Sequence, residues 1–191
     1  ISETVVDLST EQRNNFVDDE ILVAIAELRL SVSPLVDDPT FIRRITLDLT
    51  GKLPEYNSET EAGHLNREAM VDELLSSKNF VDFYTFKLAK LLRIQSKVDK
   101  NLVTTTPKAA RAFHDWLAQQ LRDGAGYDQM TREIITATGN SSEYGPATFY
   151  TAVEDARRQT EFATEVFMGS RMKCANCHNH PLDKWTQDDF H

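Results

Sequence analysis

Apolar residues recur at helical spacing along almost the whole chain, and this periodicity is the feature that most limits its fold. Phe41, Ile45 and Leu49, for example, lie on one face of a predicted helix that ends at Gly51. The sequence lacks long runs of alternating apolar and polar residues with paired turn signals, which would predict strands. It therefore predicts an all-α fold.

Start and stop signals divide this pattern into separate helices. They are expected over residues 16–28, 38–50, 80–94, 107–121, 127–137 and 154–170. Asp38 followed by Pro39 is expected to cap the second of these helices, and Thr106 followed by Pro107 the fourth. Thr186, with acidic residues after it, is expected to cap a helix that follows the cysteines. Short acidic helices are expected after Pro54, the first capped by Ser58, and the next is expected to bury Met70, Val71, Leu74 and Leu75. Aromatic and aliphatic residues surround most of segment 80–94, which predicts that it is the core helix.

The predicted organisation is a single helical domain over residues 1–191. Residues 1–139 form a helical scaffold, and the Gly-, Pro- and Ser-containing stretch 140–152 is expected to be a loop. Residues 153–191 form a helix and a cysteine motif. Because His191 falls in what is expected to be the first turn of a helix, we expect the chain to be a fragment of a longer protein.

Composition excludes several function classes. The chain has 21 basic and 30 acidic residues, a formal net charge of −9, which disfavours nucleic acid and anionic membranes as partners. The longest apolar candidate, residues 21–30, is interrupted by Glu27 and Arg29, so no membrane span is expected.

Both cysteines of the chain lie in one motif, C-x-x-C-H, formed by Cys174, Cys177 and His178. This arrangement is typical of covalent haem attachment in c-type cytochromes. Two thiols one helical turn apart can add to the two vinyl groups along one edge of a porphyrin. The adjacent imidazole can then bind the iron from the proximal side. The motif predicts haem c, attached through Cys174 and Cys177, with His178 as iron ligand.

Two other interpretations of the motif stay open. Zinc could use the two thiolates and two imidazoles of Cys174, Cys177, His178 and His180, although ligands so close in sequence would strain one tetrahedron. A structural zinc or metal module would then act as an interaction scaffold for a downstream domain. The cysteines could instead form a disulfide or a redox pair, but that loop would be too small to stabilise the fold much.

Residues around the motif are candidates for contacts with the cofactor. Arg171 and Lys173 could pair with the haem propionates, or could simply be solvated charges. Trp185 could form a flat wall against the porphyrin, or belong to a small satellite core. His180 is a possible second metal ligand, a propionate contact or a hydrogen-bonding loop residue next to Pro181.

An electron-transfer cytochrome needs a sixth iron ligand, and the sequence offers none that is convincing. Met168 and Met172 lie just before the attachment site, and the other methionines occupy apolar helical positions. Either the distal ligand lies beyond His191, or the iron keeps an open site that would allow catalysis. The predicted function is electron transfer or haem-based redox chemistry.

Two segments resemble a known family. Residues 167–191, with the pattern C-x-x-C-H-x-H-P-x-x-x-W, and residues 35–54 are similar to the cytochrome-like domain of planctomycete-type bacteria, a bacterial domain of unknown function. The resemblance implies an exported protein of the periplasm or cell envelope, in which a second conserved domain follows in the same polypeptide. It also implies a redox partner whose identity the sequence does not give.

Overall fold

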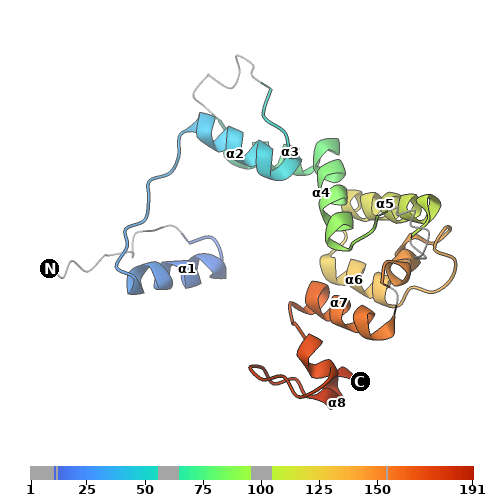
Figure 1. Ribbon diagram of the computed structural model, residues 1–191. Helices are drawn as coiled ribbons and strands as arrows, with labels where there is room; N and C mark the ends of the chain where they lie inside the picture. Colours follow the sequence, from blue (N-terminus) through green and yellow to red (C-terminus); the bar gives the residue numbers. More distant parts are fainter. Residues whose placement is uncertain (1–10, 12, 56–64, 96–104, 154) are drawn as a thin grey trace. The chain divides into compact units, whose positions relative to one another are not determined.

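The computed structural model describes residue 11 and residues 13–55, 65–95, 105–153 and 155–191. These residues form helices and connecting segments without a strand, which confirms the predicted all-α class (Figure 1). The contacts divide the chain into two units, Ile1–Phe41 and Ile42–His191, and each unit is described by itself. Within the described residues, no helix combines the length and the apolar composition that a membrane crossing requires.

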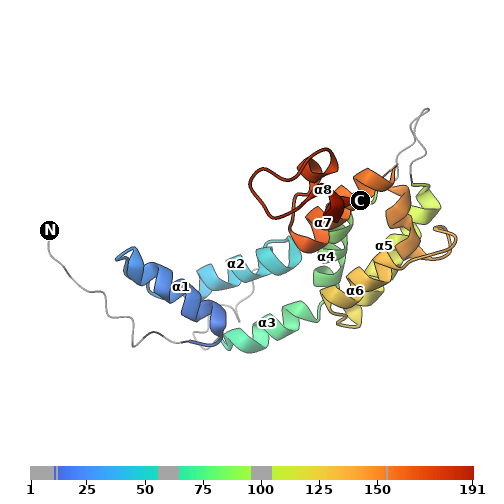
Figure 2. The same cartoon turned by 90° about the horizontal axis from the view of Figure 1, so that it is seen from below.

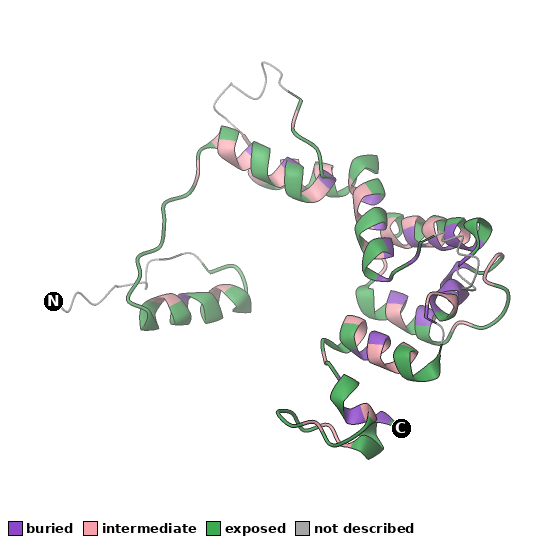
Figure 3. Ribbon diagram, viewed as in Figure 1, coloured by how far each residue is buried: buried purple, intermediate pink, exposed green. Residues whose placement is uncertain are grey.

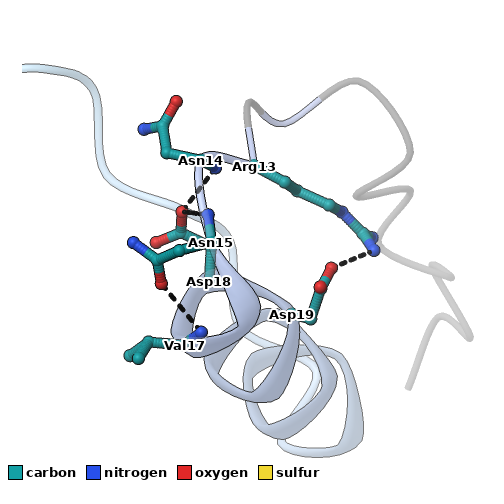
Figure 4. Close-up of polar contacts among 6 residues, drawn as sticks. All are labelled: Arg13, Asn14, Asn15, Val17, Asp18 and Asp19. Atoms are coloured by element: carbon teal, nitrogen blue, oxygen red, sulfur yellow. Dashed lines mark hydrogen bonds and ion pairs between the residues drawn. The ribbon is translucent and has the colours of Figure 1, made fainter.

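The described part of the first unit contains α1 (Phe16–Glu27), close to the expected span. Its N-terminus is a capping box, in which the Asn15 side chain accepts a hydrogen bond from the Val17 amide at 2.8 Å (Figure 4). The Asp18 carboxylate accepts reciprocally from the Asn15 amide at 3.2 Å. Although α1 is rich in apolar residues, Leu22 is its only buried residue (Figure 3).

The next helix, α2 (Asp38–Thr50), begins at Asp38, the residue expected to be its cap. Asp37 rather than Asp38 caps it, because the Asp37 carboxylate accepts from the Thr40 amide at 3.0 Å and its carbonyl from the Phe41 amide at 2.9 Å. Asp38 belongs to the first turn, where its negative charge interacts favourably with the positive end of the helix dipole.

In the two helices after α2, burial differs from what the sequence predicts. In α3 (Arg67–Leu75) no residue is fully buried: of the side expected to be buried, Met70, Val71 and Leu74 are half-buried and Leu75 is exposed. The acidic helices expected after Pro54, with their Ser58 cap, fall mostly outside the described residues. In α4 (Lys78–Leu91) the buried residues are Val81, Thr85 and Ala89 and not the aromatic ones; the Phe86 side chain is 60% exposed.

The central helix is instead α5 (Pro107–Arg122), which begins at the predicted Thr106 cap. Its face of Ala109, Phe113 and Leu117 is almost completely buried. Helix α4 packs across α5, and α6 (Tyr127–Ile135) lies beside it (Figures 1 and 2). The main core comprises Ala89, Leu92, Ile94, Ala110, Phe113, Leu117, Met130, Ile134, Phe149, Val153 and Phe162.

The stretch expected to be a loop contains a buried 3-10 helix, η2 (Gly145–Thr151). Gly145 is required there because a β-carbon would lie 2.4 Å from the carbonyl oxygen of Ala112 on α5. This close approach inserts Phe149, which is 1% exposed, into the main core. Sequence composition identified the Gly and Pro residues correctly as a break in the helices but missed the burial.

Candidate functional site

The cysteine motif follows α7 (Ala156–Met168), in agreement with the helix expected over 154–170. Asp155 caps the helix by accepting from the Arg158 amide at 3.0 Å. Gly169, with φ 63°, ends it in the left-handed conformation that glycine adopts without steric cost. The chain then turns into the short 3-10 helix η3 (Lys173–Asn176), which contains the first cysteine of the motif.

The geometry of η3 places the two thiols together. A 3-10 helix has three residues per turn, so residues three apart share a face. Cys174 and Cys177 are three apart, and the Cys177 amide donates to the Cys174 carbonyl at 3.3 Å. Both side chains are exposed and neither forms a disulfide. Two free thiols are therefore available on one face of this turn.

A small cluster, here called the motif core, holds this turn in place. It consists of Met172, Ala175 and Phe190, all buried, with Trp185 packed against them. Phe190 comes from α8 (Gln187–Phe190), which contacts η3. Trp185 therefore packs on a small satellite core, and its buried indole Nε1 has no hydrogen-bond partner among the described residues.

The start of α8 is fixed by a second capping box. The Asp189 carboxylate accepts from both the amide and the hydroxyl of Thr186, each at 2.8 Å. These hydrogen bonds lower the pKa of Asp189 below its ordinary value of 3.8, and the bond from the Thr186 amide has the larger effect. Asp189 therefore acts as a capping group, as its position after Thr186 predicts.

Hydrogen bonds give the two histidines of the motif opposite tautomers. The Nδ1 of His178 lies 2.7 Å from the carbonyl oxygen of Asn179, which can only accept, so Nδ1 carries the proton. The Nε2 of neutral His178 then has a free lone pair. His180 differs, because its Nδ1 accepts from the Leu182 amide at 3.2 Å, so the proton of the neutral ring is on Nε2. This arrangement suits His178, and not His180, to bind a metal.

The loop between the histidines and α8 is closed by backbone contacts. The His180 amide donates to the Trp185 carbonyl at 2.8 Å. The Asn179 side chain accepts from the Gln187 amide at 3.0 Å. These bonds hold the exposed histidine segment against the end of α8.

The four side chains of the zinc alternative do not converge. Among the residues that the structure describes, no three His, Cys, Asp or Glu side chains are grouped so that they could hold a metal ion. Structural zinc sites bring together four such ligands in a tetrahedron. Cys174, Cys177, His178 and His180 therefore form no preassembled zinc site.

The two cations proposed to flank a cofactor are in different situations. Arg171 is 86% exposed and lies 3.5 Å from the Glu165 carboxylate, which makes it a surface ion pair. Lys173 has no carboxylate partner among the described residues and lines a cavity. Of the two, Lys173 is the one that is free to meet an acidic group.

That cavity, of about 1120 Å³, lies beside η3 and was not expected from the sequence. It is lined by the segment after α4, by the end of η2, by α7 and by η3. Its charged residues are Arg93, Asp155, Arg157, Arg158, Glu161, Glu165 and Lys173. Neither cysteine lines it. No local pattern marks Arg93, which follows a run of leucines without a glycine stop signal.

The methionines near the motif are poor candidates for a distal iron ligand. Met172 is 4% exposed and committed to the motif core, whereas Met168 is 59% exposed at the end of α7. Met130 belongs to the main core. Each has the packing or surface role that its sequence position suggests.

The described residues thus form an all-helical protein whose C-terminal end exposes two thiols on one turn, next to a histidine with a free Nε2. Residues 16–191 match the family described as PSCyt2, protein of unknown function (DUF1549). The chain belongs to this family. It matches no curated protein and no solved structure.

Proposed function

We propose that the chain is a c-type cytochrome domain that binds haem covalently through Cys174 and Cys177, with His178 as the proximal iron ligand. The proposal includes the exported location and the redox partner that the family resemblance implies. When bound, haem iron supplies one-electron transfer, and its potential depends on the axial ligands and their surroundings.

The observation that carries the proposal is the contact between His178 Nδ1 and the Asn179 carbonyl, which assigns the tautomer of the ring. A histidine that binds a metal through Nε2 must keep its proton on Nδ1, usually by donating it to a carbonyl or carboxylate. The 2.7 Å contact between His178 Nδ1 and the Asn179 carbonyl meets this condition. The backbone of the next residue, Asn179, thus orients the His178 ring without a bound metal.

The residues next to the motif fit a group attached at one turn. Attachment to two thioethers requires two free thiols on one face, and Cys174 and Cys177 are free, exposed and one 3-10 turn apart. The motif core keeps this turn folded through Met172, Ala175 and Phe190. Haem needs only one axial ligand from this segment, and His178 is placed next to the two thiols to supply it.

The test is export of the protein from a cell that attaches haem, followed by a haem-stained denaturing gel and visible spectra before and after dithionite. We expect a covalent haem signal and sharp α and β bands in the reduced protein. The double variant Cys174→Ser/Cys177→Ser is the matched control. It should lose the covalent signal while its far-ultraviolet circular dichroism keeps the helical shape.

The same preparation distinguishes the alternatives. A broad high-spin spectrum with covalent haem would indicate an open iron and a catalytic role rather than electron transfer. A protein without haem that holds one zinc ion per chain would overturn the proposal and identify a structural metal module.

A further inference from the structure

Arg93 occupies a backbone position that normally favours glycine. It follows the last residues of α4 with φ 58°, and the Arg93 amide donates to the Lys90 carbonyl at 3.1 Å. The next amide, of Ile94, donates to the Ala89 carbonyl at 2.9 Å, which completes the helix-ending motif in which glycine is commonest. A non-glycine residue in this conformation costs about 1 kcal/mol. Residues in such strained backbone conformations cluster at functional sites.

The Arg93 side chain lines the cavity beside η3 and lies over a buried ring. The centre of its guanidinium is 4.3 Å from the centroid of Phe162, which is 4% exposed. This contact is a cation–π interaction, and among the described residues no hydrogen bond or ion pair involves the guanidinium N–H groups. These N–H groups form a planar fork that matches the two oxygens of a carboxylate or phosphate.

Cations without a carboxylate partner surround the same cavity. In the part of the chain that the structure describes, no ion pair involves Arg93, Arg157 or Lys173, each of which comes from a different segment.

Among the described residues of the lining, Asp155 and Glu165 are paired with arginines, whereas Glu161 accepts from a neutral amide and keeps its negative charge. Asp155 caps α7 and pairs with Arg158 at 3.4 Å, and Glu161 accepts from Asn176 at 3.3 Å. Glu165 pairs with Arg171. The cations that remain available face the cavity in a protein whose net charge is −9.

We propose that this cavity binds a small organic acid with at least two acidic groups, and that the Arg93 fork holds one of them. Arg157 and Lys173 supply the charge for the rest of the ligand. The volume of about 1120 Å³ is slightly above the usual range for small-molecule sites, about 300–1,000 Å³. Two sources present the same acidic oxygens: a free acid, and the acidic side chains of a group attached at the neighbouring thiols.

The test measures binding of citrate and of inorganic pyrophosphate to the unmodified full chain by titration calorimetry at low ionic strength. Added salt should weaken binding, because the lining cations are solvent-accessible. The decisive variant is Arg93→Gly, which suits the backbone conformation and removes the fork. We expect it to weaken binding at least tenfold while the protein stays folded.

Arg29→Gly is the matched control. Arg29 also follows a helix with positive φ, 54°, and the same substitution removes the same charge, but Arg29 does not line the cavity. Its binding should equal that of the unmodified chain. Arg93→Lys, which keeps the charge without the fork, should weaken binding less than Arg93→Gly.

Repeating the titration on protein with covalently attached haem identifies the source of the acid. If citrate binds the haem-free chain but not the loaded one, the propionates occupy the cavity; equal binding to both indicates a free acid. The free-acid arm does not depend on haem attachment, so it stands if the proposed function fails. Equal binding by Arg93→Gly and the unmodified chain, or no binding of either probe to the unmodified chain, would overturn the proposal.

Discussion

The Nδ1 of His178 lies 2.7 Å from the carbonyl oxygen of Asn179, its immediate neighbour in the chain. A hydrogen bond between such close residues needs no tertiary packing, so the ring orientation is a local property of the motif. His180, two residues further on, has the opposite hydrogen bond and the opposite tautomer.

The first prediction follows from this difference. In haem-loaded protein, His178→Ala should abolish the sharp reduced α band, because the iron loses its proximal ligand while both thioethers remain. His180→Ala should leave the reduced spectrum unchanged. Visible spectroscopy of the two variants checks this, and a loss of the α band in His180→Ala would reverse the assignment of the ligand.

A second prediction concerns the turn at the end of α2. A β-carbon on Gly51, where φ is +69°, would lie 2.4 Å from Cε2 of Phe83, whereas one on Gly124, where φ is +66°, would meet nothing within 4 Å. Gly124→Ala should therefore cost only the conformational penalty, about 1 kcal/mol. Gly51→Ala should cost a further 1–3 kcal/mol, roughly, from overpacking. Urea unfolding at 25 °C measures both, and equal losses would show that Phe83 moves aside freely.

The third prediction tests which helix is central. Phe113 on α5 is 0% exposed, and Phe113→Ala should lower the free energy of unfolding by about 3–5 kcal/mol. Phe86 on α4 is 60% exposed, and Phe86→Ala should change it by less than about 0.5 kcal/mol. The two values come from the same denaturant experiment. A larger effect at Phe86 would restore α4 as the core helix.

The fourth prediction concerns pH. Asp189 has a lowered pKa in the folded protein, so its contribution to stability is present above its ordinary value of 3.8 and is lost as the pH falls through the lower folded value. Thr186→Ala removes the hydroxyl bond but keeps the backbone bond, and should raise the Asp189 pKa part of the way towards 3.8. Carboxyl titration by NMR measures this shift.

The control for that titration is Thr136→Ala on the C-cap of α6. The Thr136 hydroxyl donates to the Arg132 carbonyl at 2.8 Å and has no contact with Asp189. Its loss should leave the Asp189 pKa unchanged. An unchanged pKa in Thr186→Ala as well would mean that the backbone bond alone sets the shift.

Helix positions were predictable because their signals are local. Thr106 followed by Pro107 caps α5 as expected, and Asp155 with Gly169 delimits α7. The burial of α4 was not predictable in the same way. Its aromatic residues predict a central helix, yet smaller residues such as Ala89 face α5, because burial depends on which neighbour packs against a helix rather than on its own composition.

In the candidate site too, local features could be predicted from the sequence and features formed by distant segments could not. The cysteine spacing, the cap at Thr186 and the position of Trp185 can all be inferred from neighbouring residues in the sequence. The cavity cannot, because it joins the ends of α4 and η2 to α7 and η3, segments far apart in the chain. The position of the Arg93 side chain also depends on the Phe162 ring of α7, whose centroid lies 4.3 Å from the guanidinium centre.

The separation of the motif core from the main core has a dynamic consequence. The two clusters share no residue, and the motif core has only three fully buried members. Segments with few buried contacts open at a lower free energy than the whole molecule. Amide hydrogen exchange around Ala175 should therefore report a subglobal opening, faster than exchange at Phe113. We therefore expect the turn that carries both thiols to unfold and refold as a unit while the helices of the main core stay folded.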